Sequence, residues 1–550
     1  MLGQMQPQAL LISSLITHAE RHHASSEIVS RRVEGDIHRS SWAQISRRSR
    51  QVANAIDRLG LSRGERLATL AWNGYRHLEL YFGVSGSGRV LHTLNPRLHP
   101  EQLAWIINHA QDQALCFDLT FLPLVQAVAA KCPTVRHWIA LCDAERLPAD
   151  SGIAALQSYE AWIGAHASDY HWPDLDENAA AGMCYTSGTT GNPKAALYSH
   201  RSTLLHAYAA ALPDSLNLSA RDSVLPVVPM FHVNAWGIPY SAAAVGCKLV
   251  FPGPALDGKS IYELLQSEQV SMAAGVPTVW QMLLNHMQAG GLKFSSLKRT
   301  VIGGSACPPA MIEAFSQRYG VAVLHAWGMT EMSPLGTVCA LKNAQLALPP
   351  EQQSQVLLKQ GRAVFGVDMK IVDPDGRDLP WDGQSCGDLL VRGPWVIASY
   401  FKDEGGDPLR RDADGRGWFA TGDVATIDAE GYMQITDRSK DVIKSGGEWI
   451  SSIDVENIAM AHPAVALAAC IGIKHPKWDE RPIIVVVKKP GAELGRDELL
   501  AFYQGKIAKW QIPDDALFVD AIPIGATGKM QKMKLRQQLQ DYRLPQWVGQ

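Results

Sequence analysis

One loop of the sequence is rich in hydroxyl groups and glycine and ends in a lysine, Tyr185-Thr-Ser-Gly-Thr-Thr-Gly-Asn-Pro-Lys194. Gly188 and Gly191 allow backbone N–H groups to approach a polyanion, while the hydroxyls and the Lys194 ammonium add further donors. The spacing of a Walker loop, Gly-x-x-x-x-Gly-Lys-[Ser/Thr], is absent. A polar surface turn is the alternative interpretation, but six Ser, Thr and Gly residues in succession favour a phosphate-binding loop.

Further stretches downstream carry residue types suited to nucleotide chemistry. Glycine in Gly303-Gly-Ser-Ala306 removes side chains, so that a flat base or an acyl chain can lie against the backbone. Each stretch, taken alone, also has an interpretation without function. Asp423 could be a turn aspartate and Glu331 an acid at a helix start. Residues 303–306 could form an ordinary strand–helix turn, and Lys529 could be a solvated lysine. The other stretches are Ala326-Trp-Gly-Met-Thr-Glu331, Thr421-Gly-Asp423, Asp437-Arg438, Ser445-Gly-Gly-Glu448 and Thr527-Gly-Lys529.

Taken together and in this order, the motifs resemble those of the adenylate-forming enzymes, the family of acyl-CoA synthetases, luciferases and nonribosomal-peptide adenylation domains. The resemblance covers most of residues 40–540 and implies ATP, Mg²⁺ and CoA as cofactors and co-substrates. It further implies an ATP- and AMP-binding set comprising Thr186, Ser187, Gly188, Thr189, Thr190, Gly191, Lys194, Gly304, Ser305, Ala306, Ala326, Trp327, Gly328, Met329, Asp423 and Arg438.

The same resemblance implies the catalytic roles. A carboxylate must attack the α-phosphate of ATP, so a metal and fixed cationic donors are needed where charge builds up. Glu331, together with Thr186, would hold Mg²⁺; Thr330 would contact the α-phosphate, and the Lys529 ammonium would bridge the reacting oxygens. Two positions depart from the family pattern, Ala195 in place of glycine and Ile524 in place of arginine.

The family mechanism has two half-reactions separated by a rotation of the C-terminal domain. We expect residues 439–440 to be the hinge, with Lys440 absorbing the backbone change, because hinges lie at junctions and not in packed elements. Gly447 would then leave room for the pantetheine arm of CoA.

The acyl site is expected at Pro229-Met-Phe-His-Val-Asn-Ala-Trp-Gly-Ile-Pro-Tyr240. This stretch contains no acid that would pair an α-ammonium group, which favours an amine-free carboxylic acid. His232 would line the mouth of the site, Trp236 resembles the aromatic gate of fatty-acyl-CoA synthetases, and Gly303 would contact the acyl chain. A core tryptophan is the alternative for Trp236.

The nearest resemblance is to bacterial medium-chain acyl-CoA synthetases, so the predicted reaction is ATP-dependent ligation of a fatty acid to CoA, with release of AMP and pyrophosphate. Alternatives are a ligase for long-chain or other carboxylic acids, a carrier-protein acyl ligase and a luciferase-type oxygenase. A degenerate ligand-binding member of the fold is disfavoured because Lys194, Glu331, Asp423 and Lys529 are all present.

The composition argues against several other classes of protein. Fifty-one Lys and Arg against 54 Asp and Glu give a net charge of −3, which provides no electrostatic footprint for nucleic acid or an anionic membrane. No apolar run reaches the roughly 18 residues that span a bilayer. The nine cysteines include no Cys-x-x-Cys pair and predict reduced thiols without structural zinc. We expect a cytoplasmic protein and, from its relatives, a homodimer.

The elements that must position these residues alternate between helix and strand. Apolar periodicity predicts a helix over residues 42–60, and similar alternation up to a helix over 308–319 indicates parallel sheets covered by helices. Short strands dominate from about 361 to 438, and residues 497–509 are expected to be helical again. The predicted fold is α/β. A large N-terminal domain (1–438) of helix-covered sheets includes a β-rich subdomain (about 361–438), and a small, mobile α+β domain occupies 441–550.

Overall fold

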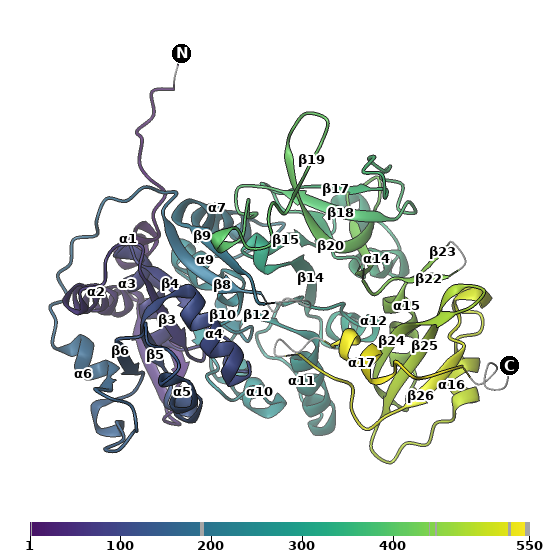
Figure 1. Ribbon diagram of the computed structural model, residues 1–550, viewed down its shortest axis with the longest axis horizontal. Helices are drawn as coiled ribbons and strands as arrows, with labels where there is room; N and C mark the ends of the chain where they lie inside the picture. Colours follow the sequence, from purple (N-terminus) through teal and green to yellow (C-terminus); the bar gives the residue numbers. More distant parts are fainter. Residues whose placement is uncertain (2, 187–191, 439, 446–447, 526–529, 545–550) are drawn as a thin grey trace.

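The computed structural model describes residues 1–550 except 2, 187–191, 439, 446–447, 526–529 and 545–550. The described residues form four sheets, of nine, seven, five and five strands. Figure 1 shows the C-terminal part of the chain at one end of the long axis, with the N-terminal strands and helices at the other. No helix among the described residues is long and apolar enough to cross a bilayer.

The seven-stranded sheet has the order β7-β6-β5-β3-β4-β8-β9, and all its pairings are parallel except that of β8 with β9. Helices α4 (Pro100–Ala110) and α5 (Leu122–Ala129) connect strands of this sheet. Its strands are β3 (Arg66–Leu70), β4 (Val90–Thr93), β5 (Asp112–Phe117), β6 (His137–Ala140), β7 (Gln157–Ser158), β8 (Ala180–Tyr185) and β9 (Ala195–Ser199).

The nine-stranded sheet has the order β16-β15-β14-β13-β12-β10-β11-β1-β2, with parallel pairing from β14 to β1. In parallel sheets the carboxyl ends of neighbouring strands meet at one edge, where ligands bind. The strands are β1 (Glu27–Arg31), β2 (Ile37–Ser41), β10 (Ser223–Pro226), β11 (Lys248–Phe251), β12 (Met272–Gly275), β13 (Arg299–Ile302), β14 (Ala322–Gly328), β15 (Leu335–Val338) and β16 (Arg362–Ala363).

Helix α3 (Tyr75–Gly86) lies between these two sheets and contacts β1 on one side and β4 and β8 on the other. All of its residues are buried. Helix α2 (Trp42–Leu59) packs on it and has the ends that the sequence predicted, since the Ser41 hydroxyl accepts from Gln44 N and Gly60 adopts a left-handed conformation. The remaining helices beside the two sheets are α1 (Ile12–His22), α6 (Tyr159–Gly164), α7 (His200–Ala211), α8 (Val233–Trp236), α9 (Ile238–Val245), α10 (Gly258–Ser267), α11 (Pro277–Gly290), α12 (Pro309–Glu313), α13 (Asn343–Leu346) and α14 (Pro350–Leu357).

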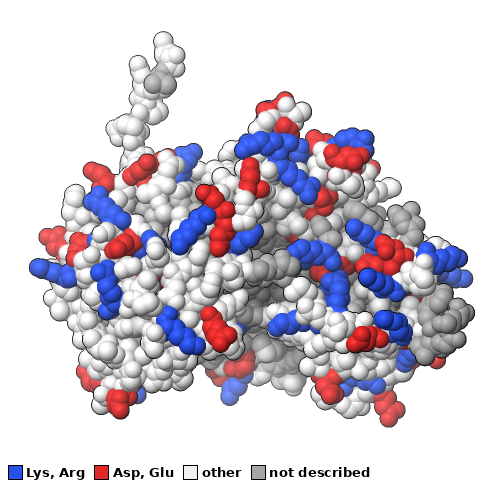
Figure 2. All heavy atoms as spheres, in the orientation of Figure 1, with Lys and Arg blue, Asp and Glu red and all other residues white. Residues whose placement is uncertain are grey.

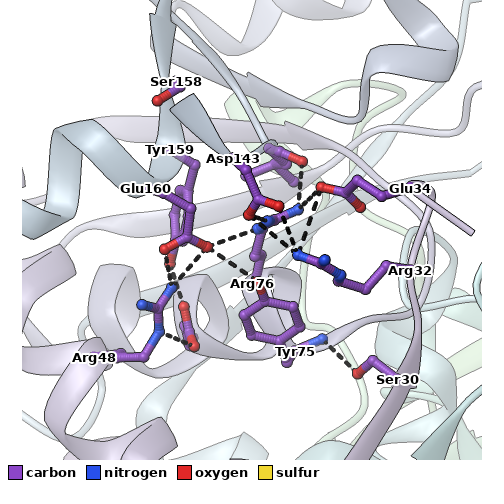
Figure 3. A network of polar contacts seen from close by, with 12 residues as sticks. Ser30, Arg32, Glu34, Arg48, Tyr75, Arg76, Asp143, Ser158, Tyr159 and Glu160 are labelled. Atoms are coloured by element: carbon purple, nitrogen blue, oxygen red, sulfur yellow. Dashed lines mark hydrogen bonds and ion pairs between the residues drawn. The ribbon is translucent and has the colours of Figure 1, made fainter. Parts of the chain in front are cut away.

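A cluster of buried ion pairs fixes the start of α3 (Figure 3). The Arg76 guanidinium contacts Glu34 at 2.6 Å, Asp143 at 2.5 Å and Glu160 at 2.8 Å. Arg48 of α2 contacts the same Glu160 at 2.9 Å. These contacts join α3 to the β1–β2 hairpin, to the loop after β6 and to α6, so the helix is held from several sides.

The β-rich subdomain is an antiparallel five-stranded sheet of the order β17-β18-β20-β19, with β21 beside β20. Aspartates close its turns: Asp428 Oδ1 accepts from Glu430 N and Tyr432 N, both at 2.9 Å. The strands are β17 (Asp368–Val372), β18 (Gly387–Arg392), β19 (Leu409–Arg411), β20 (Gly417–Ile427) and β21 (Met433–Arg438).

The C-terminal part is a second five-stranded sheet of the order β23-β22-β25-β24, with β26 parallel to β25. Its elements are β22 (Ile443–Ser445), β23 (Glu448–Ile450), α15 (Ser452–Met460), β24 (Val465–His475), β25 (Asp479–Lys488), α16 (Arg496–Phe502), β26 (Asp515–Phe518) and α17 (Lys532–Gln538).

The predicted α/β class, with a large N-terminal and a small C-terminal part, is confirmed. Two expected helices end early. The helix expected over 497–509 stops at Phe502, and the one expected over 308–319 changes to a π-helical turn at Ala314–Arg318. Figure 2 shows acidic and basic side chains interspersed over most of one face, as the small net charge implies. All nine cysteines are free.

Candidate active site

Four stretches that the sequence singled out follow strands of the two large sheets. The hydroxyl-rich loop joins β8 to β9, and residues 229–236 follow β10. Residues 303–306 follow β13, and the Thr330–Glu331 segment follows β14. Because β10, β13 and β14 run parallel in one sheet, their carboxyl ends bring the last three stretches to the same edge.

The base of the hydroxyl-rich loop is a closed hairpin. Thr186 N donates to Lys194 O at 2.8 Å, directly after the pairing of Tyr185 with Ala195. Lys194 Nζ lies 5.0 Å from the centre of the Tyr400 ring and packs on the backbone of Gly405. Ser187, Gly188, Thr189, Thr190 and Gly191 lie outside the described residues.

Glu331 lies in a short 3-10 helix, Thr330–Met332, and is only 8% exposed. The Tyr400 hydroxyl donates to Glu331 Oε1 at 2.8 Å, and Ile397 N donates to Glu331 O at 2.9 Å. Tyr198 of β9 donates through its hydroxyl to Thr330 O at 2.6 Å. Thr330 and Glu331 are thus fixed by the segment after β18 and by the strand that leaves the hydroxyl-rich loop.

A magnesium ion fits this arrangement. Mg²⁺ prefers one or two carboxylates together with substrate phosphates and water over an all-protein cage. Glu331 offers such a carboxylate, and the hydrogen bond from the Tyr400 hydroxyl would orient it. Among the described residues, no group of three or more His, Cys, Asp and Glu side chains is placed to hold a metal ion.

Three residues of the expected nucleotide-binding set converge. Trp327 Nε1 donates to Asp423 Oδ2 at 2.9 Å. Asp423 on β20 pairs in register with Arg438 on β21, and Arg438 Nε lies 4.0 Å from Asp423 Oδ1. The Arg438 side chain is 47% exposed, so it can turn toward a ligand, whereas that of Asp423 is only 15% exposed.

The acyl-site stretch contains an unusual left-handed turn. Val233, Asn234, Ala235 and Trp236 have φ values of 47°, 52°, 47° and 58°. A left-handed conformation costs a non-glycine residue about 1–2 kcal/mol, so tertiary contacts must maintain this turn. His232, which directly precedes the turn, is half-buried.

Trp236 lies against the glycines that follow β13. A Cβ atom added to Gly303 would approach Trp236 Cη2 to 3.3 Å and Ala326 O to 2.8 Å, and one added to Gly304 would lie 3.9 Å from Trp236 Cζ2. The structure therefore brings residues expected at the acyl chain, Trp236 and Gly303, next to residues expected at the nucleotide, Gly304 and Ala326. Ser305 is exposed and Ala306 half-buried in the same loop, and Gly328 and Met329 follow Trp327 at the end of β14.

Lys440 is exposed in the turn between β21 and β22. Salt bridges and hydrogen bonds lie on both sides of it: Arg536 of α17 contacts Asp441 at 2.7 Å, and Asp437 Oδ2 accepts from Ser452 N at 2.6 Å. Burial raises the pKa of Asp437, and nearby Lys532 opposes that shift. Gly447 and Lys529 lie outside the described residues.

The sequence analysis did not predict two residues near the site, Tyr400 and His206. Tyr400 joins Lys194 to Glu331, and burial together with the Glu331 carboxylate raises the pKa of its hydroxyl. His206 of α7 accepts from Leu335 N at 3.1 Å through Nε2, and burial lowers its pKa to about 3. No local pattern marks either residue, because their partners are distant in the sequence.

Both the N-terminal and the C-terminal part of the chain match known protein families. Residues 16–401 match the AMP-binding enzyme family, and residues 454–529 match the AMP-binding enzyme C-terminal domain. The chain is 54% identical to the 3-methylmercaptopropionyl-CoA ligase of Ruegeria lacuscaerulensis, covering 98% of this chain and 99% of the relative. It is 51% identical to the medium-chain-fatty-acid–CoA ligase of Ectopseudomonas oleovorans, covering 99% and 98%. The crystal structure of an anthranilate CoA ligase in complex with anthranoyl-AMP superposes with a TM-score of 0.86 at 24% identity, covering 97% of this chain and 98% of that one, and supports the fold.

Proposed function

The chain belongs to the AMP-binding, adenylate-forming enzyme family, and we propose that it ligates medium-chain fatty acids to CoA through an acyl-adenylate. The single observation that carries the proposal is the left-handed turn that seats Trp236 on Gly303, next to residues expected at the nucleotide. The 51% identity to a medium-chain-fatty-acid–CoA ligase over nearly the whole chain supports the same acid class.

In the first half-reaction, an acid oxygen bonds to the α-phosphorus of ATP and the bond to the pyrophosphate leaving group breaks. Magnesium, when bound, neutralises phosphate charge, and Glu331 is the residue that would hold it, with Thr186 nearby in the sequence of the phosphate loop. Lys194 and Lys529 would supply cations where charge builds up, and Thr330 would contact the α-phosphate. Asp423 and Arg438 would hold the ribose.

In the second half-reaction, the CoA thiolate attacks the acyl carbonyl carbon, and the bond to AMP breaks. The proposed hinge at 439–440 would bring Gly447 to the site in place of Lys529. The position of Lys440 in the turn between β21 and β22 supports this role, because hinges lie at such junctions between elements.

The acyl site favours an uncharged chain. The 229–240 stretch contains no acidic residue, and Trp236 offers apolar surface beside His232. Each buried methylene contributes about 0.8 kcal/mol, which is roughly fourfold in kcat/KM, until the chain meets the end of the site. Activity should therefore rise with chain length and then fall.

A short thioether acid is a second candidate, because the chain is 54% identical to a 3-methylmercaptopropionyl-CoA ligase. A thioether sulfur makes favourable contacts with aromatic rings, and Trp236 provides such a ring at the proposed site. The two candidates differ in whether sulfur or chain length is recognised.

The test is CoA-dependent AMP formation with ATP, Mg²⁺ and straight acids from acetate to palmitate. Pentanoate and 3-methylmercaptopropionate form a matched pair, since they differ in one sulfur for one methylene. A maximum at intermediate lengths, with little preference within the pair, is expected. Activity that rises up to palmitate would indicate a long-chain ligase, and strong preference for the thioether acid would replace the proposal by the second candidate. AMP formation that does not require CoA would point to a carrier-protein ligase or an oxygenase.

The homodimer and the cytoplasmic location expected from the sequence stay predictions. Light scattering of the purified protein would test the first, and fractionation of the producing cells would test the second.

A further inference from the structure

We propose that Asn73 and Tyr81 are positioning residues that determine acid selectivity by holding the left-handed turn that carries Trp236. The inference rests on the proposed function, because it takes Trp236 to line the acyl site. It adds the parts of the chain that fix where this tryptophan stands, which lie on α3 and directly before it, more than 150 residues earlier in the sequence.

The turn needs such a support. Its four successive non-glycine residues have positive φ values, a conformation that L-amino acids avoid as a run. Within the stretch itself, His232 N and Ala235 N donate to Pro229 O at 3.1 and 3.2 Å, and Gly237 N donates to Asn234 O at 2.9 Å. These bonds do not remove the steric cost of four left-handed residues, which contacts with other elements must offset if Trp236 is to stay against Gly303.

Asn73 forms hydrogen bonds with the backbone that precedes the turn. Its Nδ2 donates to Pro226 O at 2.8 Å and to Val228 O at 2.9 Å, while Oδ1 accepts from Met230 N at 2.6 Å. Asn73 is 4% exposed, so water cannot replace these bonds. Only an amide offers two donors and one acceptor in this geometry: aspartate lacks the donors, and leucine lacks all three groups.

Tyr81 holds the turn itself. Its hydroxyl donates to Met230 O at 2.6 Å and lies 3.2 Å from Oδ1 of Asn234, a residue of the left-handed run. The Tyr81 side chain is fully buried, and its ring centre lies 5.5 Å from that of Tyr240 on α9, directly after the turn. Tyr81 therefore contacts the stretch before, within and after the strained residues.

Both residues are anchored to a rigid element. Arg76, in the first turn of α3, is pinned by Glu34, Asp143 and Glu160, as Figure 3 shows. Tyr75 N also donates to the Ser30 hydroxyl at 3.0 Å. This partly buried charge cluster thus fixes the start of the helix from which Asn73 and Tyr81 reach the proposed acyl-site turn.

The test compares Asn73→Ala and Tyr81→Phe with the wild type. Ser87→Ala is the matched control, because the Ser87 hydroxyl is also buried, directly after α3, but donates to Val84 O at 2.9 Å, a partner outside the 229–240 stretch. Trp236→Ala reports on the acyl site itself. For each protein, kcat/KM is measured over the ladder of straight acids, together with KM for ATP, the melting temperature and the acid-dependent rise in that temperature.

We expect Asn73→Ala and Tyr81→Phe to lower the ratio of kcat/KM between the preferred acid and one two carbons longer by about tenfold, the scale of discrimination by methylene fit. KM for ATP should change less than about twofold, and the acid-dependent rise in melting temperature should lose the same chain-length preference. Ser87→Ala should lower the melting temperature without altering the acid ratios.

The inference is wrong if Asn73→Ala and Tyr81→Phe slow all acids by one common factor, or if they behave like Ser87→Ala. If Asn73→Ala does not fold, Tyr81→Phe decides alone, because it removes one oxygen and keeps the ring. A selectivity that is unchanged in Trp236→Ala would instead overturn the placement of the acyl site. Altered selectivity in Trp236→Ala, but in neither Asn73→Ala nor Tyr81→Phe, would overturn only the positioning role.

Discussion

The hydroxyl of Tyr400 donates a hydrogen bond to Oε1 of Glu331 at 2.8 Å, across 69 positions of the chain. The ring of the same tyrosine lies 5.0 Å from the ammonium of Lys194. One aromatic side chain from the β-rich subdomain therefore touches both the proposed metal-binding carboxylate and the lysine of the proposed phosphate loop.

Replacing Tyr400 by phenylalanine should weaken the use of magnesium. The hydroxyl orients the Glu331 carboxylate, and the loss of a hydrogen bond to a metal-binding group typically costs about 10–100-fold in metal affinity. We expect the Mg²⁺ concentration for half-maximal adenylation to rise about tenfold, with activity largely restored at saturating Mg²⁺. Calorimetric titration of ATP with and without Mg²⁺ provides a readout that does not depend on turnover.

Tyr432→Phe is the control for that prediction, because the Tyr432 hydroxyl donates to Ala340 O at 2.8 Å, a partner outside the proposed metal site. Equal Mg²⁺ curves for Tyr400→Phe and the wild type would show that the Tyr400 hydroxyl does not support the metal site.

His206→Gln should reduce the amount of unfolding free energy that the protein loses as the pH falls. Burial lowers the pKa of His206 to about 3 from 6.5, so this histidine is neutral in the folded protein while the unfolded chain takes up a proton below pH 6.5. Its contribution to stability is therefore fully present above pH 6.5 and is lost as the pH falls toward 3. At pH 5 the loss from this group is about 2 kcal/mol of unfolding free energy.

Denaturation curves at pH 8 and pH 5 check this sign and size. Glutamine keeps an acceptor for Leu335 N without a titrating group, so the variant should lose about 2 kcal/mol less than the wild type between these pH values. Equal losses in both proteins would mean that His206 is not held neutral.

Lys529→Ala should abolish adenylation and leave ATP binding largely intact, because the ammonium is expected to act where charge develops and not in the ground state. Loss of one such group costs about 10²–10³ in rate. ATP–pyrophosphate exchange measures the step, and nucleotide titration measures binding. Lys534→Ala, at an exposed position of α17, is the control. Undiminished adenylate formation would remove Lys529 from the mechanism.

Lys440→Pro should separate the two half-reactions. Proline fixes φ near −65°, so the proposed hinge could no longer change its backbone angles. We expect adenylate formation to continue and thioester formation to fall, each measured in a single-turnover assay. Lys440→Ala removes the same side chain but keeps the backbone free and should be close to the wild type. Full overall turnover by Lys440→Pro would exclude the hinge at this residue.

Local signals in the sequence predicted much of the fold. The helix over 42–60 was predicted from its apolar period and final glycine, and the strand over 299–302 matches β13 at both ends. The helix expected over 497–509 was too long, since the helix ends at Phe502 and Gly505, shortly after it, has a φ value of 74°. Apolar periodicity indicates which face of a segment is buried, but it does not fix the residue at which the helix ends, and glycine favours termination there.

The sequence by itself determined which functional groups are available: a hydroxyl-rich loop that ends in Lys194, acids at Glu331 and Asp423, and a 229–240 stretch without an acidic residue. The tertiary structure alone decided that Tyr400 reaches Glu331 and that Asn73 supports the backbone before Trp236. A motif consists of residues that are close together in the sequence, so it can be recognised from a single sequence. Contacts across 69 or 157 positions depend on how whole sheets and helices pack, and no local pattern of residues specifies them.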